Sequence, residues 1–165
     1  MSKDLQLSHL NSREEPDMVD VSNKEVSQRM AKARARIWVG KEILSQLKLD
    51  NFNTKKGSII QTAIIAGQMA VKNTSQLIPL CHPLRLTSCH IEIDVIDDER
   101  LEVNCEVKAV DRTGVEMEAL TGASIAALTL YDMLKALSQA LVIEEVRLLE
   151  KHGGKNDYSF ESKSF

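Results

Sequence analysis

The sequence of 165 residues is poor in aromatic side chains and carries no excess of positive charge. Aromatic residues make up 4% of the chain, and 21 Lys and Arg against 24 Asp and Glu give a formal net charge of −3. Proteins that bind nucleic acid use a basic surface and aromatic rings that stack on bases. Both are scarce in this sequence, so we expect no nucleic-acid partner.

Long hydrophobic runs are also missing. The chain has no stretch of the roughly 18 apolar residues that a transmembrane helix needs, and residues 1–17 are polar and acidic, unlike a secretory signal. The sequence therefore predicts a cytoplasmic protein with no membrane partner. The only cysteines are Cys81, Cys89 and Cys105, an odd number without the spacing of a disulfide scaffold, so we expect no structural disulfide.

Length and composition favour one folded domain, since 43% of the residues are hydrophobic and 165 residues suffice for a single core. We expect this domain at residues 18–158, between a flexible N-terminal arm at 1–17 and a C-terminal tail at 159–165. Alternating apolar residues, helical spacing and turn residues predict strands at 30–39, 89–95, 101–109 and 142–149, and helices at 41–49, 59–72 and 115–139. Without the first short helix the order is β-α-β-β-α-β, which predicts an α+β fold with a ferredoxin-like sheet.

Ionisable residues interrupt the apolar run of the last predicted helix. Asp132 and Lys135 are three residues apart and share a helix face, so they are candidates for a coupled proton-transfer pair. A surface ion pair explains the same spacing equally well. Glu118 precedes Asp132 by fourteen residues, about 21 Å along a helix, so the two cannot touch one small ligand within a protomer. Either Glu116 and Glu118 stabilise the helix start, or a second subunit brings Glu118 close to another Asp132.

Leu80-Cys81-His82-Pro83 places a thiol and an imidazole in a loop that the proline stiffens. His82 is a candidate acid, base or donor. The alternative is a zinc site built from Cys81-His82 and Cys89-His90. Strand alternation argues against it, because Cys89 would point into the core and His90 away from it.

Two further segments are candidates for anion binding. Lys55-Lys56-Gly57-Ser58 precedes a predicted helix whose N-cap would be Ser58, and helix N-termini attract anions. Lys151-His152-Gly153-Gly154-Lys155 would supply flexible backbone between two lysines. Solvated lysines and a mobile tail are the competing explanations.

Four stretches of the chain closely resemble the MoaC family of molybdenum cofactor biosynthesis. They are MVDVSNKEVSQRMAKARA (18–35), KGSIIQTAIIAGQMAVKNTSQLIPLCHPL (56–84), TGVEMEALTGASIAALTLYDMLKA (113–136) and VRLLEKHGGKND (146–157). The resemblance implies a lyase that converts 3′,8-cyclo-7,8-dihydroguanosine 5′-triphosphate into cyclic pyranopterin monophosphate with release of pyrophosphate. It implies no cofactor and no metal at this step.

The resemblance also implies roles for individual residues and an assembly. Asp132 and Lys135 look like the family's catalytic acid/base pair, while substrate contacts are implied for Leu80, Cys81, His82, Met117, Glu118, Lys56, Glu116, Lys151 and Asp20. The implied assembly is a homohexamer of three dimers with active sites between subunits. A non-catalytic nucleotide-binding or oligomerisation module of the same fold, and a zinc hydrolase, are the competing functions.

Overall fold

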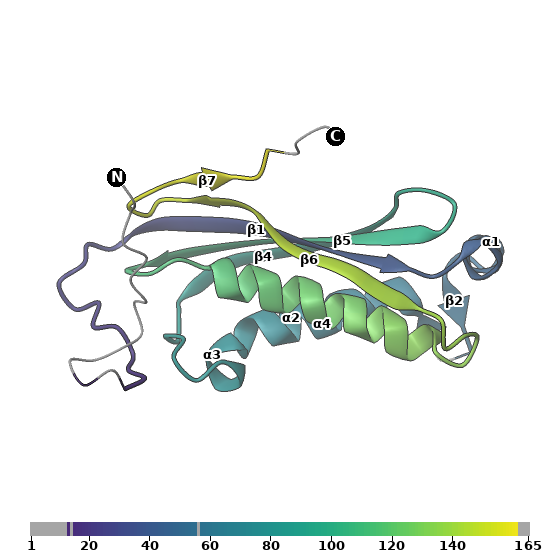
Figure 1. The fold of residues 1–165 in the computed structure, drawn as a ribbon, viewed down its shortest axis with the longest axis horizontal. Helices are drawn as coiled ribbons and strands as arrows, with labels where there is room; N and C mark the ends of the chain where they lie inside the picture. Colours follow the sequence, from purple (N-terminus) through teal and green to yellow (C-terminus); the bar gives the residue numbers. More distant parts are fainter. Residues whose placement is uncertain (1–12, 14, 56, 162–165) are drawn as a thin grey trace.

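One antiparallel sheet carries two long helices on a single face (Figure 1). The computed structural model describes residues 13, 15–55 and 57–161. Its elements in chain order are β1 (Ser27–Trp38), α1 (Lys41–Leu49), β2 (Asn53–Thr54), β3 (Gly57–Ser58), α2 (Ile59–Lys72), α3 (Thr74–Leu77), β4 (Leu86–Val95), β5 (Arg100–Asp111), α4 (Glu116–Leu134), β6 (Val142–His152) and β7 (Tyr158–Ser159).

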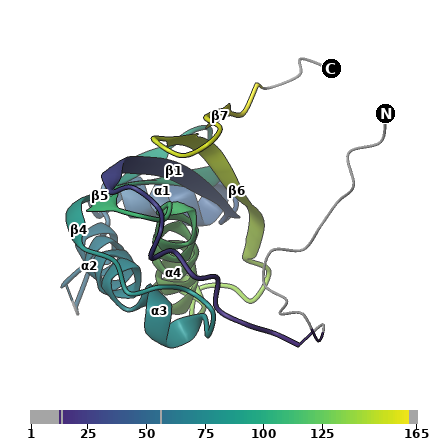
Figure 2. The ribbon, with the colours of Figure 1, turned by 90° about the vertical axis from the view of Figure 1, so that its left-hand side faces the viewer.

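The main strands and helices confirm the predicted α+β, ferredoxin-like fold. The sheet order is β4-β5-β1-β6-β7 with antiparallel pairing throughout. The chain passes through β1, α2, β4, β5, α4 and β6, which is the predicted β-α-β-β-α-β order. Figure 2 shows α2 and α4 side by side beneath the sheet, with β7 at its edge. The short helix expected after Gly40 is α1, whereas α3, β7 and the small β2-β3 ribbon were not predicted.

The core lies between the sheet and the two long helices. Ala31, Ala33, Ala35 and Ile37 of β1 are fully buried, and they alternate with charged residues that face away from the helices. Small side chains on β1 let α4 pack closely against the middle of the sheet. The alternation therefore gives β1 a basic outer face, formed by Lys32, Arg34 and Arg36.

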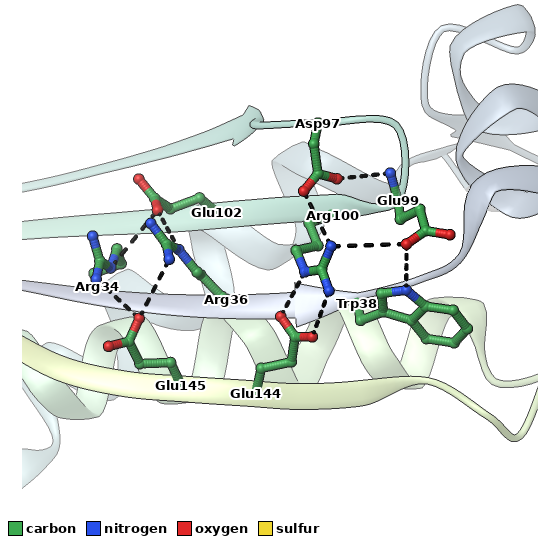
Figure 3. Close-up of polar contacts among 9 residues, drawn as sticks. All are labelled: Arg34, Arg36, Trp38, Asp97, Glu99, Arg100, Glu102, Glu144 and Glu145. Carbon is green, nitrogen blue, oxygen red and sulfur yellow. Dashed lines mark hydrogen bonds and ion pairs between the residues drawn. The ribbon is translucent and has the colours of Figure 1, made fainter. Parts of the chain in front are cut away.

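The outer face of the sheet is tied together by ion pairs between neighbouring strands (Figure 3). Arg36 of β1 stands opposite Glu102 of β5 and Glu145 of β6, and its Nε lies 2.8 Å from Glu102 Oε2. Further along, Arg100 Nε lies 2.9 Å from Glu144 Oε2, and Trp38 Nε1 donates to Glu99 Oε2 at 3.1 Å. Opposite charges across strands favour this register over a shifted one.

A pair of glycines allows α2 and α4 to approach closely. A Cβ added at Gly67 of α2 would lie 2.9 Å from the carbonyl oxygen of Gly122 in α4. One added at Gly122 would lie 2.5 Å from Val71 Cγ2 and 2.7 Å from Cys105 Sγ. Glycine is a poor helix former, so this close contact explains its presence in the middle of α4.

The last helix and the last long strand differ from their predicted bounds. The helix expected at 115–139 ends at Leu134, because the N–H of Leu137 donates back to the Leu134 carbonyl at 2.8 Å and starts a tighter turn. Lys135 is thus the C-cap of α4, where its N–H donates to Tyr131. The strand expected at 142–149 continues to His152, because Glu150 to His152 pair with β1. Among the described residues, every helix is too short or too polar to cross a bilayer.

Most of the predicted N-terminal arm, residues 1–12 and 14, lies outside the described residues, and so does the candidate substrate contact Lys56. Its neighbour Ser58 is the N-cap of α2, as predicted, and its side chain accepts a hydrogen bond from the Gln61 N–H at 3.3 Å.

Candidate active site

A cleft opens at the start of α4, where three segments distant in sequence meet. We call it the main cleft; it has a volume of about 360 Å³ and is lined by Val19, Val21, Lys24, Leu80, Cys81, His82, Leu84, Thr113, Gly114, Glu116, Met117 and Glu118. The structure therefore brings together the predicted contacts of the 80–82 loop and of the 116–118 helix start. A cleft of this size falls within the range of small-molecule sites, about 300–1,000 Å³.

The loop that carries His82 is anchored at both ends. At its start, buried Thr74 donates its hydroxyl to the carbonyls of Ala70 and Val71 at 3.2 and 3.1 Å, which fixes α3 to the end of α2. At its end, the Arg85 N–H donates to Asp111 Oδ2 at 3.1 Å and joins the loop to the end of β5. Pro83 further restricts the backbone next to His82. The imidazole is thus carried on a stiff loop.

Glu118 is the buried acid of the main cleft. It lies in the first turn of α4 and lines the main cleft, and only 4% of its surface is exposed. Burial raises the pKa of Glu118 to about 7, and the negative charge of Glu116 adds to this effect. A carboxyl group with such a pKa exchanges protons readily near neutral pH. The alternative interpretation from the sequence was that the negative charge of Glu118 stabilises the start of the helix. This fits Glu118 less well, because burial disfavours its charged form.

Two other predicted residues of this region differ in their surroundings. Burial raises the pKa of the Cys81 thiol, and the charge of Glu118 acts in the same direction. Asp20 lies near the rim of the main cleft and is exposed. A hydrogen bond from the Ser22 N–H, 2.8 Å from Asp20 Oδ1, lowers the pKa of Asp20, and the nearby charge of His82 makes a smaller contribution. Cys81 is therefore a neutral thiol and Asp20 a carboxylate at neutral pH.

A second cleft adjoins the first and is rich in cations. We call it the basic cleft; its volume is about 190 Å³ and its lining is Lys24, Arg29, Met30, Arg112, Thr113, Gly114, Glu116, Lys151, His152, Gly154 and Lys155. Lys24, Thr113, Gly114 and Glu116 belong to both clefts. Lys151 Nζ lies 3.1 Å from Glu116 Oε1 at this boundary. So many cations in a chain of net charge −3 mark a place for an anion.

Lys151 and Lys155, which the sequence predicts to flank an anion site, both line the basic cleft. Sequence reasoning missed Lys24, Arg29 and Arg112. Arg29 could have been found from the sequence, because it lies on the same face of the strand as the buried Ala31 and Ala33. A charged side chain on a buried face needs a polar partner. Its Nε and Nη2 donate to the carbonyls of Asp111 and Arg112, each at 3.2 Å.

Asp132 and Lys135 lie at the C-terminal end of α4, whereas the main cleft lies at its start. Lys135 Nζ is 2.6 Å from Asp132 Oδ1, and the side chains are 60% and 66% exposed. The hydrogen bond with Asp132 raises the pKa of Lys135. Within one chain the predicted catalytic residues are therefore separated from the substrate contacts predicted at 80–82 and 116–118, as the fourteen-residue spacing required.

Metal ligands were the remaining alternative for the cysteine and histidine residues. Within the described part of the chain, His, Cys, Asp and Glu form no cluster of three or more that is placed to hold a metal ion. Cys89 is half-buried and packs against the core, whereas His90 is exposed on the other face of β4. The strand alternation that argued against a shared zinc site is thus observed.

Comparison with known proteins places the chain beside one group of enzymes. Residues 18–154 match the MoaC family. A cyclic pyranopterin monophosphate synthase from Xanthomonas oryzae pv. oryzae is 49% identical over 156 residues, which cover 94% of each chain. The synthase of Staphylococcus carnosus is 48% identical over 161 residues, covering 96% of this chain and 99% of that one. Molybdenum cofactor biosynthesis protein 1 of Dictyostelium discoideum is 48% identical over 157 residues, which cover 86% of this chain but 25% of the relative.

Proposed function

Because the chain belongs to the MoaC family, we propose that it is a cyclic pyranopterin monophosphate synthase of molybdenum cofactor biosynthesis. The substrate is 3′,8-cyclo-7,8-dihydroguanosine 5′-triphosphate, and the enzyme releases pyrophosphate as it forms cyclic pyranopterin monophosphate. The observation that carries this conclusion in the structure is the joining of two clefts with different chemistry. One holds a buried carboxyl group with a pKa of about 7, and the other holds cations.

The basic cleft suits the phosphate groups of this substrate. Arg29, Arg112, Lys151 and Lys155 present positive charge on one side of the boundary with the main cleft. Cations placed there neutralise the charge that grows on the departing pyrophosphate, which lowers the barrier to its release. The bicyclic part of the substrate then occupies the main cleft.

The main cleft supplies groups for proton transfer. Glu118 is able to give a proton to the substrate and take one back near neutral pH, since its pKa lies close to 7. His82 faces the same cleft from the anchored loop and is the second candidate for proton transfer. Rearrangement of a purine ring into a pterin ring requires several such transfers, so more than one acid or base is useful.

Asp132 and Lys135 belong to the proposed site through a second subunit. We assign them the catalytic acid/base role in the main cleft of a neighbouring protomer, within a homohexamer of three dimers. The exposed apolar side chains of the helical layer support a partner there, because Ile65 and Met69 of α2 and Leu128 of α4 are each more than half exposed. In such an assembly the exposed Asp132–Lys135 pair would be covered and its protons would become available to substrate.

The cytoplasm is the compartment that we propose. Cys81, Cys89 and Cys105 are free cysteines, and free thiols persist best in a reducing compartment. A GTP-derived substrate also fits this location.

Turnover of the cyclic triphosphate tests the proposed function. Purified full-length protein is incubated with the substrate, and pyrophosphate and the pterin product are measured separately. We expect both in equal amounts, and we expect Glu118→Gln to reduce both strongly. Tight binding of the substrate without either product would support the non-catalytic binding module instead.

A further inference from the structure

The loop between β6 and β7, residues 153–157, is closed by a contact between its two ends. His152, the last residue of β6, places its Nδ1 3.1 Å from Asp157 Oδ2. The other oxygen of the same carboxylate, Oδ1, accepts a hydrogen bond from the Gly153 N–H at 3.1 Å. One carboxylate thus binds both the side chain and the backbone at the start of the loop.

The closed loop is seated on the first residues of β1. Gly153 has a φ of +85°, and a Cβ at this position would lie 1.9 Å from the Gln28 carbonyl oxygen. The Ser27 hydroxyl donates to the Gly153 carbonyl at 2.9 Å. The positive φ and the close backbone approach both require glycine. The start of the loop is therefore fixed against the sheet, and the Asp157 carboxylate joins this start to the residues just before β7.

The part of the loop between these anchors lines the basic cleft. Gly154 and Lys155 both face this cleft, beside Lys151 and Arg29. Lys151 is held by strand pairing on two sides, with Ala31 of β1 and Tyr158 of β7. Lys155 has no such pairing because residues 153–156 form bends. The position of its ammonium group therefore depends on whether the loop stays closed.

We propose that His152 and Asp157 are positioning residues for substrate binding: their contact keeps the loop closed and so holds Gly154 and Lys155 beside the phosphate groups of the substrate. The inference rests on the proposed function, because it assigns those phosphates to the basic cleft. Neither His152 nor Asp157 reacts with the substrate; both act through Lys155 and the loop backbone.

The strength of this contact depends on the proton of His152. The hydrogen bond to Asp157 raises the pKa of His152, and Glu150 contributes in the same direction from 3.7 Å. The charged groups around the imidazole are Asp157, Glu150, Lys151, Lys155, Arg29 and Lys108. Since the pKa is raised, the ion pair is complete below the ordinary histidine value and weakens to a neutral hydrogen bond as pH rises through the raised one.

Asp157→Asn in the full-length protein tests the proposal. At pH 6 we expect the KM for the cyclic triphosphate and the Kd for inorganic triphosphate to rise roughly threefold, the scale of an exposed ion pair, while kcat stays unchanged. The ratio of the variant's KM and Kd to those of the wild type should shrink by pH 8.5. Because variant and wild type are compared at the same pH, protonation of the ligand itself affects both equally. Asp157→Glu should restore part of the affinity.

Asp98→Asn is the matched control. It removes an exposed ion pair of similar kind, in which Lys41 Nζ lies 2.8 Å from Asp98 Oδ2 at the far end of the sheet, and it should change neither constant. If Asp157→Asn unfolds at assay temperature, His152→Gln replaces it. We expect this variant to show the same rise in KM and Kd at pH 6, and its KM and Kd should change less with pH than those of the wild type.

The outcomes separate this proposal from the proposed function. If wild-type protein binds inorganic triphosphate but yields no product, the synthase activity is refuted. The role of the loop would still be tested by the Kd for inorganic triphosphate of wild type and Asp157→Asn at the two pH values. Wild-type turnover together with unchanged KM and Kd in Asp157→Asn at pH 6 would overturn the positioning role. A fall in kcat at constant KM would overturn it as well.

Discussion

Lys151 at the end of β6 and Glu116 in the first turn of α4 form an ion pair, with Nζ 3.1 Å from Oε1, at the boundary of the main and basic clefts. The pair joins the last long strand to the helix that carries Glu118. It also holds the Lys151 ammonium group at the boundary between the two clefts. The phosphate groups of a substrate would join its reacting rings at this boundary. The two clefts therefore act as one site.

Lys151→Met tests the cation at this boundary. The change keeps the apolar stem and removes the charge, so we expect the KM for the cyclic triphosphate to rise about tenfold, the scale of one charge-assisted contact, with a smaller effect on kcat. Steady-state kinetics measure both constants. Lys41→Met, which removes an exposed lysine that lines neither cleft of its own chain, serves as the control and should leave KM as it is. Equal KM values for Lys151→Met and wild type would exclude a phosphate contact.

Glu118→Gln tests the buried carboxyl group through stability. The pKa of Glu118 is raised from an ordinary 4.5 to about 7, so the fold favours its protonated form. The carboxyl group therefore costs no stability below pH 4.5 and opposes folding progressively as pH rises from 4.5 to 7. At about 1.4 kcal/mol per pH unit, the cost above pH 7 is up to about 3 kcal/mol.

Chemical denaturation at several pH values measures this effect. Relative to wild type, Glu118→Gln should gain stability between pH 5 and pH 8 by an amount on the order of that cost. A constant difference in unfolding free energy across this range would show that Glu118 titrates normally and would remove the basis for its role in proton transfer.

Gly122→Ala tests the close contact between α2 and α4. The new Cβ would lie 2.5 Å from Val71 Cγ2 and 2.7 Å from Cys105 Sγ, and overpacking of a core typically costs about 1–3 kcal/mol. The better helix propensity of alanine returns up to about 1 kcal/mol. We expect a net destabilisation of about 1–2 kcal/mol in denaturant unfolding, with Ser124→Ala two residues further along as a control that adds no atoms. A stabilised Gly122→Ala protein would contradict the packing described here.

The sequence predicted the main elements well because each depends on local pattern. Alternation along β1 and the β4–β5 hairpin identified which side chains face the core, and the Ser58 N-cap marked the start of α2. The end of α4 was missed because helical spacing continues past Leu134, and only the tighter turn before buried Leu141 ends the helix. The sequence alone does not explain a glycine at position 122 of α4, since its partner Gly67 lies on a different helix.

Residues of the candidate site could be predicted from the sequence only where they belong to a short motif. Leu80, Cys81, His82, Glu116, Met117 and Glu118 stand in two short segments, and the fold brings both to the main cleft. Lys24 and Arg112 gave no local signal, because their meeting with Lys151 and Lys155 depends on strand order and on the end of β5. The raised pKa of Glu118 likewise follows from burial that the sequence of an amphipathic helix start does not reveal.

Asp132→Asn and Lys135→Met test the exposed pair at the end of α4. Because both side chains are largely exposed in the single chain, we expect each variant to fold with little change in Tm. Product formation should nevertheless fall by at least two orders of magnitude if the pair moves protons in a neighbouring site. Thermal unfolding and steady-state turnover measure the two effects. Turnover close to wild type in Asp132→Asn would remove the pair from the mechanism.

Complementation between two inactive variants tests most directly whether each site draws on two protomers. Glu118→Gln and Asp132→Asn proteins are mixed in equal amounts, dissociated and reassembled, and product formation is compared with each variant treated alone. If Glu118 and Asp132 of one site come from different subunits, random assembly leaves about one quarter of the sites intact, and we predict recovery of activity on this scale. Mixed assemblies that remain as inactive as the separate variants would contradict a shared site.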